Sequence, residues 1–272
     1  MSLRDLRDLA LELADVADGL TLGGFRGRGD VRTKADGTVV TAVDEAVESA
    51  LRRRILSEHP DHRVLGEEEG VSDGDPEAPL WVIDPIDATT NFVRGNPIFA
   101  TLIGVVVDGA DAVGVVSAPA LGARWDGTSE DGARQDGRVI HVSGRSGLAE
   151  AEVAFGDPRF LEDVRPGLIA DLTRRTGRQR AYGDFWNYCL VAAGSTDAVV
   201  EGRLSHWDLC ACRAVVLAAG GRVTDLDGAD RSDGRSAVAT NGLLHAAVLA
   251  VADLHRTAPE DRAGAAEDGG TT

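Results

Sequence analysis

The sequence predicts an α+β or layered α/β fold, and three observations support this. Apolar residues recur at helical spacing at both ends of the chain, β-branched runs separated by turn signals fill its middle, and strands do not alternate regularly with helices. We expect residues 1–255 to form one domain of two packed halves, about 1–145 and 146–255. Residues 256–272 are rich in Gly, Ala, Glu and Asp without periodicity, so we expect them to be disordered.

Two helices and a hairpin are expected at the start of the chain. Leucine and alanine recur at helical spacing over residues 3–22. The resulting apolar stripe consists of Leu6, Leu9, Leu13, Val16 and Ala17. Residues 31–41 can pair as a hairpin around Asp36-Gly37, a dipeptide typical of tight turns. Thr41 followed by acidic residues is a helix-start signal, so we expect a second helix that ends before His59-Pro60.

The middle of the chain reads as strands. Residues 63–66 are a short apolar run, and residues 80–83 combine β-branched and aromatic side chains as a buried strand does. Pro85 lacks a backbone donor, so we expect the strand to stop there and the chain to turn at Asp84. Apolar runs separated by Gly and Asp over residues 98–142 predict an antiparallel meander.

The second half is predicted to mix strands and helices. In order, we expect a strand at 153–155, a helix over 160–175, a helix over 184–193, a strand at 198–201, a helix over 207–219, strands at 222–224 and 237–239, and a helix over 243–254. Gly220-Gly221 would close the 207–219 helix. Four arginines, Arg174, Arg175, Arg178 and Arg180, are interpreted as the exposed basic end of the 160–175 helix. A phosphate contact made from a neighbouring subunit is the alternative.

Composition limits the partners and the compartment. The formal net charge of −17 and the pI near 4.7 exclude nucleic acids and anionic membrane surfaces as natural partners. No basic start followed by an apolar run and no long apolar stretch occurs, so we expect a cytoplasmic protein. Cys189, Cys210 and Cys212 lie in apolar segments, which favours reduced core thiols over disulfides or zinc ligands.

Two carboxylates, Asp84 and Asp87, lie three residues apart where the 80–83 strand ends. Carboxylates with a backbone carbonyl are the ligands of a hard cation such as Mg²⁺, and the amides of a helix start bind anions. The segment Asp87-Ala-Thr-Thr-Asn offers such a helix start. Taken alone, a pair with this spacing more often caps a helix than binds a metal.

Three ordered motifs resemble the inositol monophosphatase family of metal-dependent phosphatases. They are Asp84-Pro-Ile-Asp-Ala-Thr-Thr-Asn-Phe, Gly66-Glu-Glu upstream, and Trp207-Asp208 followed by Ala219-Gly-Gly. The similarity runs over nearly the whole chain, to about residue 255. Phe92-Val-Arg-Gly-Asn-Pro, Val115-Val-Ser-Ala-Pro-Ala-Leu and Gly183-Asp-Phe-Trp-Asn-Tyr most resemble the histidinol-phosphatase branch of high-GC bacteria.

This resemblance implies a layered αβαβα sandwich, of the inositol monophosphatase and fructose-bisphosphatase type, whose site binds two or three Mg²⁺ ions. The implied metal ligands are Glu67, Asp84, the Ile86 carbonyl, Asp87 and Asp208. Thr89, held by Asp44, and Glu67 would orient the attacking water, while the amides of Ala88 and Thr89 would bind the phosphate.

Each implied role has a simpler alternative. Asp44 and Asp208 fall in first turns of predicted helices, where a carboxylate caps the helix or stabilises its dipole. Residues 67–69 are three consecutive glutamates, a pattern common on solvated surfaces, and Glu68 is a second candidate ligand beside Glu67.

Ala88 departs from the family pattern, which usually has glycine there. If the position needs a positive φ, the methyl group strains it by roughly 1–2 kcal/mol. If φ is helical, alanine costs nothing. The following Thr-Thr-Asn-Phe reads as a helix start, so we expect a helical φ.

The resemblance implies a small phosphorylated metabolite as substrate, and we expect L-histidinol phosphate in histidine biosynthesis. Asp184 and Glu201 are the expected substrate-binding residues, with Asp208, because a cationic amine and an imidazole call for carboxylates. Capping of its helix is the alternative for Asp184. Inositol monophosphate or a sugar bisphosphate remains a competing substrate, and Thr90 is typical of inositol phosphatases. A catalytically silent Mg²⁺-binding or phosphate-binding regulator is the competing class. A homodimer is the family-like expectation.

Overall fold

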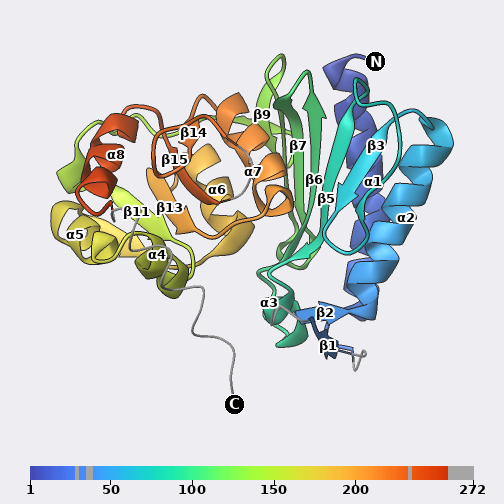
Figure 1. Cartoon of the computed structure of the whole chain (residues 1–272), viewed down its shortest axis with the longest axis horizontal. Coiled ribbons are helices and arrows are strands. Elements are labelled where there is room, and N and C mark those ends of the chain that lie inside the picture. The colour runs from blue at the N-terminus through green and yellow to red at the C-terminus, as the bar shows by residue number, and fades with distance from the viewer. Residues whose placement is uncertain (28–30, 35–38, 232–234, 257–272) are drawn as a thin grey trace.

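The computed structural model describes residues 1–27, 31–34, 39–231 and 235–256, which contain two large β-sheets and the helices that flank them (Figure 1). The helices are α1 (Leu3–Gly24), α2 (Ala42–Glu58), α3 (Thr89–Val93), α4 (Pro158–Val164), α5 (Leu168–Arg175), α6 (Asp184–Ala192), α7 (His206–Ala218) and α8 (His245–Asp253). The predicted turn at Asp36-Gly37 and the predicted disordered tail beyond Arg256 lie outside the described residues.

An eight-stranded sheet forms most of the first half, in the order β10-β9-β8-β7-β6-β5-β3-β4. Its strands are β3 (Arg63–Gly66), β4 (Gly70–Val71), β5 (Leu80–Asp87), β6 (Ala100–Val107), β7 (Ala110–Ala118), β8 (Ala123–Thr128), β9 (Gly132–Gln135) and β10 (Arg138–Ile140). Only β3 and β5 pair in parallel, so the predicted antiparallel meander is confirmed. A separate pair, β1 (Val31–Thr33) and β2 (Val39–Thr41), forms the predicted hairpin.

A five-stranded sheet forms the second half, in the order β12-β11-β13-β15-β14. Its strands are β11 (Glu152–Phe155), β12 (Arg178–Arg180), β13 (Ala198–Gly202), β14 (Arg222–Thr224) and β15 (Ser236–Thr240). Here β11 pairs in parallel with β12 and β13, and β15 pairs antiparallel with β13 and β14.

The helices and sheets alternate as five layers, seen in Figure 1 from right to left. The first two helices pack on one face of the eight-stranded sheet, and α6 and α7 fill the space between the two sheets. The helices α4, α5 and α8 cover the outer face of the five-stranded sheet. The predicted αβαβα sandwich is therefore confirmed, and the central layer brings residues from both sheets to one junction.

The N-terminal helix shows how local sequence sets this packing. Ser2 and Asp5 form a capping box at its start, and Leu6, Leu9 and Leu13 are buried against α2 and the sheet. Val16, predicted on the same apolar stripe, is instead 44% exposed. The stripe is narrower than predicted because the sheet covers only one side of the helix.

Strand β5 is longer than the sequence predicts. It continues through Pro85 to Asp87, and its pairing with β6 shifts register between Asp84 and Asp87. The bulge accommodates proline, which cannot donate a ladder hydrogen bond. The expectation that the chain turns at Asp84 was wrong, and both carboxylates lie on the strand.

Two further expectations were wrong in the second half. The predicted 160–175 helix is two helices, α4 and α5, because Pro166-Gly167 separates them and Gly167 adopts a left-handed conformation. Arg178 and Arg180 do not belong to a helix end. They form the edge strand β12, while Arg174 and Arg175 lie in the last turn of α5 as predicted.

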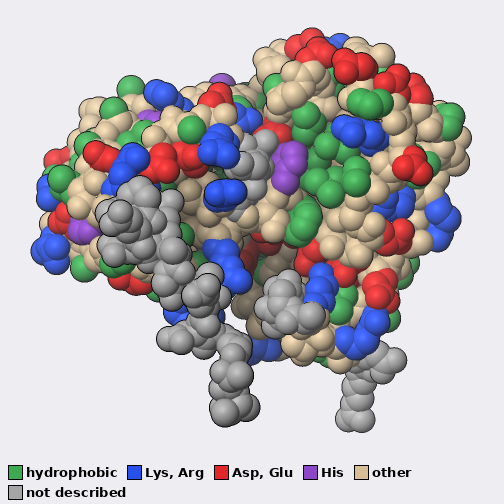
Figure 2. Space-filling view, viewed as in Figure 1, with side chains coloured by type: hydrophobic (Ala, Val, Ile, Leu, Met, Phe, Trp, Pro, Cys, Tyr) green, Lys and Arg blue, Asp and Glu red, His purple; other side chains and the backbone are tan. Residues whose placement is uncertain are grey.

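The cysteines are free thiols, and all three are buried. Cys189 and Cys212 belong to the apolar core between the two sheets, as predicted. No helix among the described residues is both long and apolar enough to cross a bilayer. On the face seen in Figure 2, arginine and lysine side chains are scattered among acidic ones.

Candidate active site

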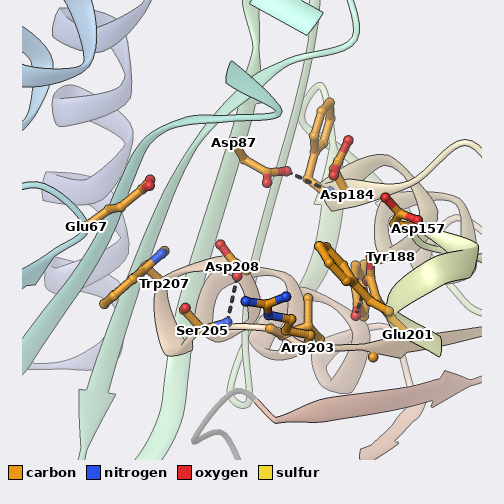
Figure 3. A pocket seen from close by; sticks show the side chains of 14 residues that line it. Glu67, Asp87, Asp157, Asp184, Tyr188, Glu201, Arg203, Ser205, Trp207 and Asp208 are labelled. Carbon is orange, nitrogen blue, oxygen red and sulfur yellow. Dashed lines mark hydrogen bonds between the residues drawn. The ribbon is translucent and has the colours of Figure 1, made fainter. Parts of the chain in front are cut away.

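A cleft of about 410 Å³ opens where the end of β5 meets the starts of α6 and α7 (Figure 3). Glu67 and Asp87 project into it from the eight-stranded sheet, and Asp184 and Asp208 project from the two helices. A neighbouring hollow, lined by Asp84, Ile86, Ala88 and Thr89, shares several of these residues. All of the sequence-predicted site residues except Asp44 thus line one continuous site, although they are up to about 140 positions apart.

Three carboxylates form the centre of the site, two of them buried and the third, that of Asp208, part-buried. Oxygen atoms of Asp84, Asp87 and Asp208 all lie within 4.8 Å of one another. Asp84 is 2% exposed and Asp87 is 8% exposed, and Asp84 Oδ1 has no hydrogen-bond partner among the described residues. Burial of this much negative charge is costly unless it is neutralised.

The pKa values in the site reflect this uncompensated charge. Burial first, and then the neighbouring carboxylates, hold the pKa of Asp84 and the pKa of Asp87 well above the ordinary range. Burial likewise raises the pKa of Asp208 to about 7. An all-oxygen donor set with an unpartnered buried oxygen fits a hard divalent cation such as Mg²⁺.

Local structure presents Asp87 and Asp208 to this centre. Asp87 Oδ2 accepts a hydrogen bond of 2.7 Å from the amide of Phe185 at the start of α6. Asp208 is the third residue of α7 and forms a capping box with Ser205, whose amide donates to Asp208 Oδ2 at 2.6 Å. The predicted capping role of Asp208 is therefore confirmed. The cap uses Oδ2, which leaves Oδ1 available to face the site.

Asp44 combines a capping role with proximity to Thr89. Its Oδ2 accepts from the amide and hydroxyl of Thr41, at 2.9 and 2.6 Å, in the capping box of α2. The Thr89 hydroxyl donates to the Ile86 carbonyl at 2.9 Å and lies 3.4 Å from Asp44 Oδ1, a long contact. Burial raises the pKa of Asp44.

Lys34, which was not predicted as a site residue, reaches the site from the β1-β2 hairpin. Its Nζ donates to Glu67 Oε1 at 2.8 Å and to Glu68 Oε1 at 2.7 Å. Burial opposes its charge, but these hydrogen bonds raise the pKa of Lys34. Glu67 and Glu68 are therefore ion-paired and part-buried, and the solvated-surface interpretation of this glutamate run was wrong for both. No local pattern marks a lysine whose partners lie 33 residues away.

Ala88 is left-handed, with φ +65° and ψ +46°, so the expectation of a helical φ was wrong. The bulged end of β5 must reverse direction within one residue to begin α3, and that tertiary requirement overrides the local helix-start pattern. The amides of Ala88 and Thr89 come before the first hydrogen bond of α3, which the amide of Asn91 donates to the Ala88 carbonyl.

Replacing Ala88 with glycine is expected to raise the free energy of unfolding by about 1 kcal/mol. Relief of roughly 1–2 kcal/mol of left-handed strain exceeds the backbone entropy of glycine, about 0.5–1 kcal/mol. Turnover should stay within about fivefold, because the backbone amide is kept. Urea unfolding measures the change. The matched control is Ala193→Gly, at φ −82°, which should lose about 0.5–1 kcal/mol. If Ala88→Gly destabilised the protein as Ala193→Gly does, Ala88 would not be strained.

Asp184 begins α6 but makes no side-chain capping bond in the described structure, so the capping alternative was wrong. Its φ is +54°, and burial, followed by the charge of Asp157, raises the pKa of Asp184 to about 6. Asp157 lies at the same end of the cleft, and Phe160 also lines the cleft. Neither was predicted from the sequence. Asp157 caps α4, a signal indistinguishable from many other helix starts.

Glu201 lies deeper than Asp184. It is 5% exposed, and its Oε2 accepts a hydrogen bond of 2.7 Å from the Tyr188 hydroxyl. Burial raises the pKa of Glu201 to about 8. Glu201 therefore forms the polar floor of the cleft, whereas Asp184 and Asp157 form its acidic wall.

Comparison with known proteins agrees with this geometry. Residues 2–257 match the model of the inositol monophosphatase family. A histidinol-phosphatase of Mycobacterium tuberculosis is 49% identical over 249 residues, covering 89% of this chain and 95% of the relative. A histidinol-phosphatase of Streptomyces coelicolor is 43% identical, covering 91% and 96%. The solved structure of an IMPase from Thermotoga maritima superposes with a TM-score of 0.83 at 32% identity, covering 92% and 97%.

Proposed function

The chain belongs to the inositol monophosphatase family, and we propose that it hydrolyses L-histidinol phosphate to L-histidinol and phosphate in histidine biosynthesis. The observation that carries the substrate assignment is the acidic wall of the cleft, Asp157 and Asp184, which lies beyond the three-carboxylate centre. The similarity to two proteins named histidinol-phosphatase supports it. We further propose that the protein is cytoplasmic and that it forms a homodimer, the latter as the sequence resemblance implies.

The centre of the site suits Mg²⁺, because its donors are all oxygen and its charge is otherwise unbalanced. The family resemblance implies that two or three ions bind there. The proposed ligands are Glu67, Asp84, the Ile86 carbonyl, Asp87 and Asp208. When bound, Mg²⁺ supplies positive charge that stabilises the phosphate oxygens and the leaving group.

The remaining residues position the reactants. The Thr89 hydroxyl donates to the Ile86 carbonyl, so the lone pairs of its oxygen can accept a hydrogen bond from the attacking water. Glu67 faces the same cleft and would hold that water from the other side. The amides of Ala88 and Thr89 would donate to phosphate oxygens, which fixes the phosphorus for in-line attack.

Charge at the far end of the cleft distinguishes the candidate substrates. Histidinol phosphate has a cationic amine and an imidazole that can be protonated, and both are attracted by Asp157 and Asp184. Asp157 is already ion-paired with Arg159, whereas inositol monophosphate, which offers only hydroxyl groups there, would bring no positive charge to the part-buried Asp184. The polar floor of Tyr188 and Glu201 can hydrogen-bond either the imidazole or a hydroxyl.

The proposal is tested by comparing kcat/KM for histidinol phosphate, inositol 1-phosphate and fructose 1,6-bisphosphate with saturating Mg²⁺. We expect the first to exceed the others by at least about tenfold, the effect of one charged hydrogen bond of about 1.5 kcal/mol. A preference for inositol 1-phosphate would overturn the substrate assignment. If none of these phosphate monoesters were hydrolysed, the alternative of a catalytically silent Mg²⁺-binding or phosphate-binding regulator would be favoured.

Mg²⁺ is expected to stabilise the protein more near pH 8 than near pH 5. The pKa values of Asp184, Asp208 and Glu201 are raised to about 6, 7 and 8. These carboxyl groups therefore bind protons more tightly in the metal-free folded state than in the unfolded state. Their contribution to the stability of the metal-free protein is fully present at a pH below the carboxyl pKa values of the unfolded chain. That contribution is lost as the pH rises through the pKa values of the folded protein. At a hundredfold excess over Kd, Mg²⁺ should restore about 2.7 kcal/mol near pH 8. Thermal unfolding with EDTA or Mg²⁺ at both pH values measures this, and an equal gain at both would contradict it.

A further inference from the structure

Cys210 differs from the other two buried cysteines. Cys189 and Cys212 pack in the apolar core, whereas Cys210 belongs to none of the apolar clusters in the described part of the chain. Its sulfur lies within 4.8 Å of a carboxylate oxygen of Asp111 on β7. The Cys210 sulfur packs directly on strand β6 at Gly104. A Cβ atom added at Gly104 would lie only 2.3 Å from this sulfur. Buried cysteine usually acts as a small apolar side chain, so this polar setting calls for another explanation.

A histidine completes a mixed donor set around this thiol. His206 Nε2 lies 3.2 Å from Asp111 Oδ1, and one donor atom each of Asp111, His206 and Cys210 lie within 4.8 Å of one another. The Asp111 side chain is 1% exposed, while that of His206 is 22% exposed, so the cluster is open to solvent on the histidine side. A small ion can enter there without unfolding of the sheet.

The charges around the cluster also suit a cation. Arg213 Nη1 donates to Asp111 Oδ2 at 3.0 Å, which leaves Oδ1 directed at His206, and Arg213 is itself paired with Asp230. Carboxylates that bind metals are commonly held by such a second hydrogen bond. A divalent cation, a thiolate, two carboxylates and one arginine sum to zero net charge, so the filled site would be neutral.

We propose that Asp111, His206 and Cys210 form a second metal site, for a borderline divalent cation such as Zn²⁺ or Co²⁺. Thiolate, imidazole and carboxylate are the ligands that Zn²⁺ takes in proteins, with water in the fourth position, whereas Mg²⁺ avoids sulfur. Binding exchanges the thiol proton for the metal. The all-oxygen catalytic centre would retain Mg²⁺.

The position of the site joins the metal to the catalytic helix. His206 and Cys210 are four residues apart on one face of α7, and Asp208, halfway between them, points from the opposite face into the cleft. A cation bound by β7 and these two residues would tie the first turns of α7 to the eight-stranded sheet. It would thereby fix the helix start that presents Asp208.

Co²⁺ is a suitable probe, because it takes zinc sites and gives a near-ultraviolet charge-transfer band only when sulfur is a ligand. We expect one equivalent of Co²⁺, added anaerobically to the Mg²⁺-saturated full-length protein, to produce this band, and Zn²⁺ to displace it. The catalytic centre contains no sulfur, so Co²⁺ bound there stays silent in this band. Excess Mg²⁺ should leave the band unchanged.

Variants assign the band to the proposed ligands. Cys210→Ser should abolish it, and His206→Gln, at a part-exposed position, should weaken Co²⁺ binding at least about tenfold while the sulfur remains. Cys189→Ala is the matched control and should keep the band. Thermal unfolding verifies that each variant is folded. Absence of the band in the unmodified protein at a hundredfold excess of Co²⁺, or its persistence in Cys210→Ser, overturns the proposal. Because these readouts are spectroscopic, they are independent of the substrate assignment.

Discussion

Replacing Asp84, Asp87 or Asp208 with asparagine, one at a time, is expected to lower Mg²⁺-dependent turnover at least about 10²-fold. Each change removes a negative charge from the centre that would hold Mg²⁺, whose electrostatic contribution to the transition state is several kcal/mol. Steady-state hydrolysis of histidinol phosphate and of p-nitrophenyl phosphate measures the loss. It should appear with both substrates, because both carry the same phosphate group.

Stability separates this effect from misfolding. In the metal-free protein the three clustered carboxylates repel one another, so each asparagine variant should be at least as stable as the parent in EDTA. The gain of stability on adding Mg²⁺ should shrink in parallel with turnover. Asp126→Asn is the matched control, because Asp126 is also buried but lies on β8 beside Arg7. Full activity of the EDTA-treated parent without added metal would falsify the metal mechanism.

Asp184→Asn is expected to lower kcat/KM for histidinol phosphate by about 1.5–3 kcal/mol, a loss of roughly 10-fold to 150-fold. The change removes the proposed partner of the cationic amine while leaving the shape of the side chain. Asparagine tolerates a left-handed conformation, so the φ of +54° is preserved. Hydrolysis of p-nitrophenyl phosphate, which has no amine, should fall far less.

The ratio of the two kcat/KM values is the quantity that decides the role of Asp184. Asp163→Asn, an exposed carboxylate on the neighbouring helix α4, is the matched control and should change neither substrate. Equal losses on both substrates would instead indicate that Asp184 acts through Asp87, whose pKa its charge helps to raise. The acidic wall would then have no part in substrate choice.

Most of the carboxylates that gather in the site could be selected from the sequence, because each one lies at a boundary that local patterns mark. Asp84 and Asp87 follow an apolar strand run, and Asp208 falls in the first turn of a helix. Residues without such a mark were missed. Lys34 has none, and the helix-cap signal of Asp157 does not distinguish it from other helix starts. Both reach the cleft only because a hairpin and a helix start from distant parts of the chain are packed against it.

Short-range periodicity and motif order thus determined the layered fold, the identity of the family and the acidic composition of the site, since these depend on residues close together in the chain. Only the tertiary structure decided the conformation of Ala88, the ion pair of Lys34 with Glu67, and the polar setting of Cys210. The physical reason is the same in each case. A backbone dihedral at a strand bulge and a contact across the sheet are imposed by packing with remote segments, and local propensities are too weak to oppose it.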